Sequence, residues 1–250
     1  METNIDGIKT YYEISGSGPY VLMIPGWAAR CRLYQPVADA LSSSFSVILL
    51  DLPGFTGGTD EPPEAWDVEG FVTFVIHFIE KLGIRELSLA GHSYGGRVII
   101  RMMNRSSLPF TVKKIVLIDA AGIKPVRTAS QKRKQAVFRF MKHFIPKDKL
   151  DDYKKKHGSA DYRNASPLMR QCLVKSINDD LTDLLPSVSP ETLLIWGTAD
   201  TATPIGDGEK MEKLMPDAGL VRLENAGHFS FLDQPVIFER VMKSFFGIKF

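Results

Sequence analysis

The sequence predicts an α/β fold built on a doubly wound, mostly parallel sheet. Its 250 residues, of which 44% are hydrophobic and 24% charged, suffice for one large globular domain. Short apolar runs alternate along the chain with amphipathic stretches of helical length, an alternation typical of doubly wound sheets. Most runs are continuously apolar, as expected of strands that are buried on both faces of a parallel sheet.

Six short apolar runs are the strand candidates, and one amphipathic stretch is the clearest helix. Apolar residues recur at helical spacing from Val68 to Leu82, and Gly83 is a suitable C-cap. This pattern predicts a helix that packs one face against the sheet. In chain order, the strand candidates are Tyr20–Ile24, Val47–Leu50, Leu87–Ala90, Ile115–Ile118, Thr192–Ile195 and Leu220–Leu223.

The segment 123–186, called the basic segment below, differs in charge from the rest of the chain. It contains 15 Lys and Arg against 7 Asp and Glu, whereas the whole chain has a net charge of only +2. This charge can be a solvated helical surface, or a positive field that attracts anionic substrates to an active site. Both interpretations stay open at the level of the sequence.

The basic segment also predicts helices and contains no strand-like run. An apolar stripe at helical spacing extends over residues 136–145, and Ser166 followed by Pro167 is typical of a helix start. We therefore expect the basic segment to be a helical insertion between two strands of the sheet. The core of the domain would then consist of residues 1–122 and 187–250.

Cysteine count, hydropathy and charge exclude several classes of protein. Two cysteines, Cys31 and Cys172, are too few for a disulfide framework or a metal cluster of their own. No stretch approaches the roughly 18 apolar residues of a membrane span, and residues 1–12 lack the apolar core of a signal peptide. A net charge of +2 is too small to imply a nucleic-acid partner. We expect a cytoplasmic monomer or homodimer that acts on a small molecule without a metal or cofactor.

The sequence GHSYGG at positions 91–96 contains the candidate nucleophile. It follows the predicted strand Leu87–Ala90 directly and precedes a helix-like stretch at 97–104. A strand, a tight turn and then a helix is the context in which G-x-S-x-G forms a nucleophile elbow. The glycines allow the strained turn and its close packing against neighbouring elements. Ser93 is therefore predicted to be a catalytic nucleophile.

A serine nucleophile needs a base that is itself oriented by a carboxylate. His228 follows the predicted strand Leu220–Leu223 and is the candidate general base. Asp200 lies just past the strand Thr192–Ile195 and is the candidate acid. Both residues emerge at the carboxyl ends of strands, the edge at which open α/β sheets build their sites.

Other titratable residues are weaker candidates. Asp119 follows the strand Ile115–Ile118 and could reach the same imidazole, so it is the rival of Asp200. Asp51 also ends a strand, but a Pro-Gly pair at 53–54 turns the chain away directly after it. The remaining histidines are expected in an amphipathic helix (His77), beneath the serine turn (His92) or at the surface of the basic segment (His143 and His157).

An oxyanion hole requires two backbone donors. One is the N–H of the residue after the nucleophile, here Tyr94, and the other comes from an upstream loop. The sequence PGWA at 25–28 follows the strand Tyr20–Ile24, so the N–H of Trp27 is the natural second donor. The indole of Trp27 can pack beneath the insertion at the same time.

Taken together, these motifs resemble the α/β-hydrolase superfamily, specifically its small serine hydrolases that carry a cap. The resemblance implies an eight-stranded, mostly parallel sheet with helices on both faces, a helical cap at 123–186 and a Ser93–His228–Asp200 triad. Two positions depart from the usual pattern: Pro25 stands where relatives often have His, and TGGT at 56–59 replaces Gly-x-Ser. The resemblance rests on PGW at 25–27, DLPGF at 51–55, GHSYGG at 91–96, WGTAD at 196–200 and GHF at 227–229.

The resemblance restricts the mechanism more than the substrate. It implies hydrolysis of a small carboxylic ester or related acyl compound through an acyl intermediate on Ser93. Two alternatives stay open: a hydrolase that cleaves a carbon–carbon bond next to a carbonyl, and a signalling receptor of low turnover that closes on a small ligand. Phe140 and Phe144, on the apolar stripe of the basic segment, are predicted to line the acyl pocket.

Overall fold

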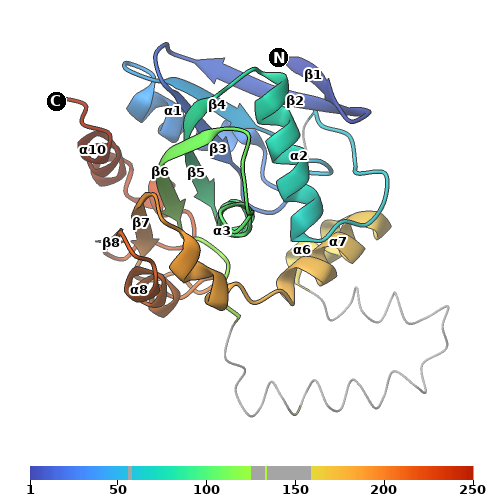
Figure 1. Ribbon diagram of the computed structural model, residues 1–250. Helices are drawn as coiled ribbons and strands as arrows, with labels where there is room; N and C mark the ends of the chain where they lie inside the picture. Colours follow the sequence, from blue (N-terminus) through green and yellow to red (C-terminus); the bar gives the residue numbers. More distant parts are fainter. Residues whose placement is uncertain (56–57, 125–132, 134–158, 250) are drawn as a thin grey trace.

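The computed structural model describes residues 1–55, 58–124, 133 and 159–249 (Figure 1). Its centre is an eight-stranded sheet with the strand order β1-β2-β4-β3-β5-β6-β7-β8. Strands β4, β3, β5, β6, β7 and β8 pair in parallel, and β2 is antiparallel to both of its neighbours. The predicted α/β fold with an eight-stranded, mostly parallel sheet is therefore confirmed.

All six predicted strands occur in the structure, and two further strands precede them. The strands are β1 (Glu2–Ile5), β2 (Ile8–Ser15), β3 (Tyr20–Ile24), β4 (Ser46–Leu50), β5 (Glu86–His92), β6 (Thr111–Ile118), β7 (Glu191–Gly197) and β8 (Ala218–Leu223). The sequence analysis does not predict β1 and β2. The reason is visible in β2, where buried residues alternate with partly or fully exposed ones, so no continuous apolar run marks it.

Helices cover both faces of the sheet, as predicted. They are α1 (Gln35–Leu41), α2 (Val68–Lys81), α3 (Tyr94–Met102), α6 (Ala160–Asn164), α7 (Pro167–Ile177), α8 (Ile205–Leu214), α9 (Ser230–Asp233) and α10 (Pro235–Phe245), with 3₁₀ turns η1 (Cys31–Tyr34) and η2 (Thr182–Ser187). Helices α1 and α10 bury their apolar residues against one face of the sheet. Helices α2, α3 and α8 bury theirs against the other face.

Alternate residues of a central strand belong to different cores. In β3, Val21 and Met23 pack in the core shared with α1 and α10, whereas Leu22 and Ile24 pack in the core shared with α2 and α3. All four side chains are fully buried. This double burial explains why the central strands read as continuous apolar runs in the sequence.

Helix α2 begins and ends where local signals predict. The carboxylate of Asp67 accepts hydrogen bonds from the backbone N–H groups of Glu69 and Gly70, at 3.0 and 3.2 Å, and so caps the first turn. Gly83 follows the helix with φ +69°, a conformation that glycine adopts without a steric penalty. The helix lies beside α3 in the layer that covers the sheet (Figure 1).

The described part of the basic segment contains α6, α7, η2 and no strand. The predicted helix start is confirmed, because Ser166 Oγ accepts the N–H of Met169 at 3.1 Å and Pro167 is the first residue of α7. Helix α7 packs on the chain that leads into α2, where the N–H of Trp66 donates to Cys172 Sγ at 3.3 Å. The predicted pocket residues Phe140 and Phe144, together with His143 and His157, lie outside the described residues.

Candidate active site

Ser93 occupies the turn between β5 and α3 in a strained backbone conformation. Its φ is 48° and its ψ is −110°, outside the regions that L-residues favour. Backbone hydrogen bonds hold the turn: the Ser93 N–H donates to the Ile118 carbonyl at 3.0 Å, and the Ser93 carbonyl accepts the Ala121 N–H at 2.8 Å. The end of β6 and the loop after it therefore fix the serine in place.

The glycine after Tyr94 is required by close packing. A Cβ at Gly95 would lie 2.1 Å from the carbonyl oxygen of Ile24, at the end of β3. A Cβ at Gly91 would lie 2.7 Å from the carbonyl carbon of Gly95. These contacts leave no room for a side chain, so the G-x-S-x-G spacing follows from the tight turn.

His228 lies between Ser93 and Asp200. Its Nε2 is 3.0 Å from Ser93 Oγ, and its Nδ1 is 2.8 Å from Asp200 Oδ2. The His228 side chain is 22% exposed, whereas the Asp200 carboxylate is fully buried. In this arrangement the serine hydroxyl can donate to Nε2 while Nδ1–H donates to the carboxylate. The structure thus brings together the three residues that the sequence analysis selects.

Asp200 is held by several donors from its own loop. Its Oδ1 accepts the N–H of Ala202 at 2.7 Å and that of Thr203 at 3.1 Å, and the Thr203 hydroxyl donates to Oδ2 at 2.7 Å. Burial acts to raise the pKa of Asp200, but the hydrogen bonds from His228 and Thr203 outweigh it and lower that pKa below its ordinary value. The carboxylate is therefore ionised at neutral pH.

Asp119 does not bind the imidazole. Its Oδ1 accepts the Gly197 N–H at 2.8 Å, and its Oδ2 accepts the Ser230 N–H at 3.1 Å and the Ser230 hydroxyl at 2.6 Å. Its side chain thus ties the end of β7 to α9 behind the site. Burial raises the pKa of Asp119 to about 6, although these donors oppose the shift. The geometry favours Asp200 over this rival as the partner of His228.

The other polar candidates lie in separate contacts. Asp51 accepts the N–H of Cys31 at 2.5 Å, and its burial raises its pKa. His77 pairs with Asp6 near the start of the chain. His92 is buried beneath the serine turn, as expected, where burial lowers its pKa to about 3.

Trp27 and Tyr94, the two predicted oxyanion-hole residues, lie on separate segments of the chain. Trp27 follows the end of β3, and Tyr94 is the first residue of α3. Within the part of the chain that the structure describes, neither N–H donates a hydrogen bond. The rings of the two residues make an edge contact with centroids 5.2 Å apart, so the two chain segments are packed together. An N–H without an acceptor in the chain can donate to a developing oxyanion, and the assignment of these two groups to an oxyanion hole stays a prediction.

Comparison with known proteins identifies the family of the chain. The model of the alpha/beta hydrolase family matches residues 21–241. The chain belongs to this family. It is accordingly an enzyme, a hydrolase.

Two solved structures and one curated relative illustrate the similarity. A pimeloyl-[acyl-carrier protein] methyl ester esterase of Nitrosomonas europaea is 28% identical over 248 residues, which cover 90% of the hydrolase and 94% of that protein. An esterase from Exiguobacterium antarcticum matches with a TM-score of 0.77 and 24% identity, covering 98% and 99% of the two chains. The meta-cleavage product hydrolase CumD from Pseudomonas fluorescens IP01 matches with a TM-score of 0.75 and 22% identity, covering 99% and 97%. Both structural matches show the shared fold.

Aromatic side chains surround the Trp27 side of the site. The Trp27 ring contacts Phe55 with centroids 4.9 Å apart, and the Tyr94 ring contacts Phe55 and Phe71 at 5.6 and 5.5 Å. The Tyr94 hydroxyl lies 3.0 Å from Ser176 Oγ on α7, where both side chains are buried. The described part of the basic segment therefore contacts the side chain of the residue that directly follows Ser93.

The sequence analysis does not predict the roles of Thr203 and Tyr34. A signal for Thr203 exists, since an Asp whose side chain accepts N–H groups two and three residues later is a common turn pattern. Tyr34 has no such signal. Its hydroxyl lies 2.9 Å from His92 Nδ1, a residue 58 positions away in the chain.

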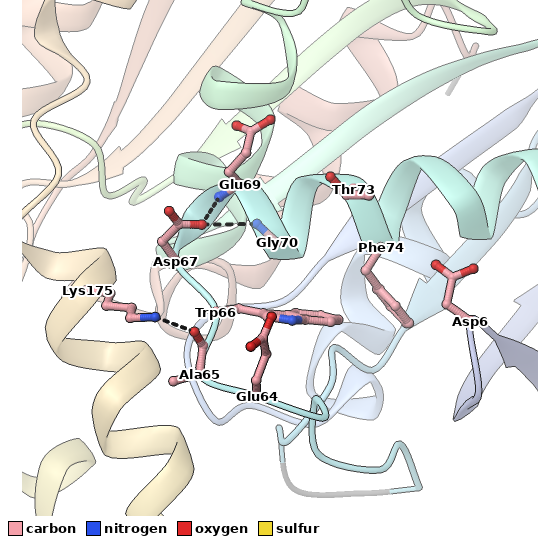
Figure 2. Close-up of a pocket in the computed structure, with 10 residues that line it drawn as sticks. All are labelled: Asp6, Glu64, Ala65, Trp66, Asp67, Glu69, Gly70, Thr73, Phe74 and Lys175. Atoms are coloured by element: carbon pink, nitrogen blue, oxygen red, sulfur yellow. Dashed lines mark hydrogen bonds between the residues drawn. The ribbon is translucent and has the colours of Figure 1, made fainter.

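A hollow of about 490 Å³ lies at the N-terminal end of α2 (Figure 2). Trp66 and Phe74 line it together with the carboxylates of Asp67 and Glu69, and Lys175 Nζ reaches the Ala65 carbonyl at its edge. Asp67 caps α2 and Glu69 pairs with Arg105, so both carboxylates already have partners within the fold.

No group of three His, Cys, Asp or Glu residues suited to hold a metal ion occurs among the described residues. In the same part of the chain, no helix combines the length and apolar character needed to cross a membrane.

Proposed function

We propose that the hydrolase cleaves a small carboxylic ester or related acyl compound through an acyl intermediate on Ser93. The observation that carries this proposal is the continuous contact from Ser93 Oγ to His228 Nε2, at 3.0 Å, and from His228 Nδ1 to Asp200 Oδ2, at 2.8 Å. Such a series of side chains makes a serine hydroxyl nucleophilic at neutral pH. The similarity to an esterase of Nitrosomonas europaea supports an ester as the substrate.

In the acylation step, Ser93 Oγ attacks the carbonyl carbon while its proton passes to His228 Nε2. The oxygen of the tetrahedral intermediate accepts hydrogen bonds from the N–H groups of Trp27 and Tyr94. His228 then gives the proton to the leaving alcohol as the ester bond breaks. The product of this step is an ester of the acyl group with Ser93.

In the deacylation step, a water molecule replaces the alcohol. His228 takes a proton from the water, whose oxygen attacks the acyl carbon, and the intermediate again binds at the two N–H groups. Collapse releases the carboxylic acid, and His228 returns the proton to Ser93 Oγ. Asp200 remains ionised throughout, holding the Nδ1–H tautomer and stabilising the imidazolium.

We also propose that the basic segment, residues 123–186, caps the site on a core of residues 1–122 and 187–250. The contact between Ser176 on α7 and Tyr94 at the serine turn supports a position over the site. Phe140 and Phe144 would then bound the acyl pocket together with the aromatic side chains beside Trp27.

The proposal is tested by steady-state assays with short p-nitrophenyl esters, with Ser93→Ala as the matched control. We expect turnover by the native chain, and loss of that turnover in the variant. A panel of diketones run in parallel tests the alternative reaction. Cleavage of a diketone without cleavage of any ester would instead assign a carbon–carbon hydrolase, and micromolar binding without turnover would assign a receptor.

A further inference from the structure

A series of buried hydrogen bonds connects the Trp27 loop to the backbone of His228. The N–H of Gly26, the residue before Trp27, lies 2.7 Å from the Tyr34 hydroxyl oxygen. That oxygen lies 2.9 Å from His92 Nδ1, and His92 Nε2 lies 2.7 Å from the carbonyl oxygen of His228. Three short contacts thus span the space beneath Ser93, from one side of the site to the other.

The direction of each hydrogen bond follows from the groups at the two ends. A backbone N–H can only donate, so the Tyr34 oxygen accepts from Gly26 and its own proton is free to donate to His92 Nδ1. A carbonyl oxygen can only accept, so His92 Nε2 carries the proton that is donated to His228. The carbonyl end therefore fixes a proton on Nε2, and because burial lowers the pKa of His92 to about 3, the ring is neutral and Nδ1 accepts the proton of Tyr34.

Packing leaves the two rings no freedom. Tyr34 is 0% exposed and His92 is 1% exposed. The ring of Phe231 stacks on Tyr34 with centroids 5.3 Å apart, and Phe229 stacks on His92 at 5.2 Å. A Cβ at Gly26 would lie only 2.7 Å from His92 Nδ1, so the Trp27 loop rests directly on this ring.

We propose that Tyr34 and His92 are positioning residues, which set the Trp27 N–H and the His228 imidazole relative to one another across Ser93. This inference rests on the proposed function, because it assigns those two groups to the oxyanion and the proton. Neither positioning residue forms a hydrogen bond to the reacting atoms. Tyr34 acts through the peptide that leads into Trp27. His92 acts through the carbonyl of the base and through its ring, whose centroid lies 4.9 Å from that of the His228 ring.

The two ends of the series can be separated by isosteric substitutions. His92→Gln retains an N–H donor at the Nε2 position and so keeps the bond to His228. His92→Asn retains an acceptor at the Nδ1 position, keeps the bond from Tyr34 and loses the bond to His228. Tyr34→Phe removes the hydroxyl that joins Gly26 to His92. Thr10→Val is the control, because it removes a buried hydroxyl that donates to Ile8 at 3.0 Å, away from the site.

Three measurements distinguish positioning from packing: kcat and KM for a p-nitrophenyl ester, the melting temperature, and the low-field proton resonance of His228 Nδ1–H. We expect Tyr34→Phe and His92→Asn to lower kcat by about 10- to 100-fold with little change in KM, as for a displacement of catalytic groups. The low-field resonance should shift or broaden in His92→Asn and return in His92→Gln. Thr10→Val should lower the melting temperature alone.

Wild-type kcat and an unchanged low-field resonance in both Tyr34→Phe and His92→Asn would overturn the inference. Tyr34 and His92 would then serve only to pack the core. The resonance distinguishes positioning from packing even in a variant that is much less stable, because it is recorded on the folded fraction. Failure of the proposed function gives a different result. The native chain would then hydrolyse no ester, while the response of the His228 resonance to His92→Asn would still report whether His92 positions the imidazole.

Discussion

His228 Nε2 lies 3.0 Å from Ser93 Oγ, although 135 residues separate the two in the chain. Each residue follows the carboxyl end of a parallel strand, Ser93 after β5 and His228 after β8. The intervening strands β6 and β7 place their own carboxyl ends between them, and Asp119 and Asp200 follow these strands. The site is thus assembled by the parallel direction of neighbouring strands.

Asp200 and Asp119 should respond very differently to amidation. Asp200→Asn preserves the shape of the side chain but no longer holds the Nδ1–H tautomer of His228, so kcat should fall by roughly 10⁴-fold. Asp119→Asn should lower kcat far less, because Asp119 binds Gly197 and Ser230 rather than the imidazole. Steady-state kinetics of both variants, with circular dichroism as a folding control, makes the comparison. An exchange of the two effects would assign the acid to Asp119.

Ionisation of Asp119 should destabilise the fold. The pKa of this carboxyl rises from 3.8 to about 6 through burial. Between these pH values the folded chain binds more protons than the unfolded chain, so the free energy of unfolding falls as pH rises. Relative to Asp119→Asn, the native chain should therefore lose stability from about pH 4 to about pH 6 and then change no further.

Urea unfolding of the native chain and of Asp119→Asn across this pH range measures the difference. Asp200 should affect the pH dependence of the free energy of unfolding in the opposite direction. Because the pKa of Asp200 is lowered on folding, its contribution is present above the ordinary carboxyl pKa and is lost as pH falls through the folded value. A stability difference between the native chain and Asp119→Asn that is independent of pH would contradict the assignment for Asp119.

If the charge of the basic segment attracts anionic substrates, kcat/KM for such substrates should depend on the salt concentration. A field that accelerates encounter is screened over about 8–10 Å at ordinary ionic strength. The kcat/KM for an anionic ester should therefore fall between low salt and about 0.5 M, whereas a neutral ester of equal size should barely respond. Equal responses of both esters would indicate that the charge is only a solvated surface and does not attract substrates.

Phe140 and Phe144 should determine the preferred acyl length. On the proposal that they bound the acyl pocket, Phe140→Ala or Phe144→Ala enlarges it and should shift preference toward longer p-nitrophenyl esters. The salt dependence of kcat/KM should be the same as in the native chain, because no charge changes. Variants that lose stability but keep the native acyl preference would place both residues in the core.

Strands with two buried faces could be predicted from the sequence, and strands with mixed exposure could not. Leu22 in β3 lies in one core and Met23 in the other, so the run between turns is continuously apolar. In β2, Thr10 is buried between the exposed Lys9 and the half-buried Tyr11, and the run is interrupted by polar residues. Such a strand becomes evident only once its partner β4 is known.

Constraints that neighbouring residues place on the backbone could likewise be predicted from the sequence. Contacts between side chains that are far apart in the chain could not. The conformation of Ser93 depends on glycines within three residues, and the sequence displays them directly. The contact of Tyr34 with His92 depends on how η1 packs beneath β5, which no local pattern encodes. The choice between Asp200 and Asp119 also required the structure, because both follow strand ends. The catalytic roles of these residues stay predictions.

The most direct test of the account is covalent labelling with a fluorophosphonate, read by peptide mass spectrometry and by kcat of the variants. We predict one adduct, on the peptide that contains Ser93, and no adduct in Ser93→Ala. His228→Ala should label far more slowly. Each single variant should lower kcat by about 10³- to 10⁶-fold, and the double variant should be little worse than either, because the two residues act as a unit. Strong labelling of Ser93→Ala, or an adduct at another residue of the native chain, would contradict the assignment of Ser93 as the nucleophile.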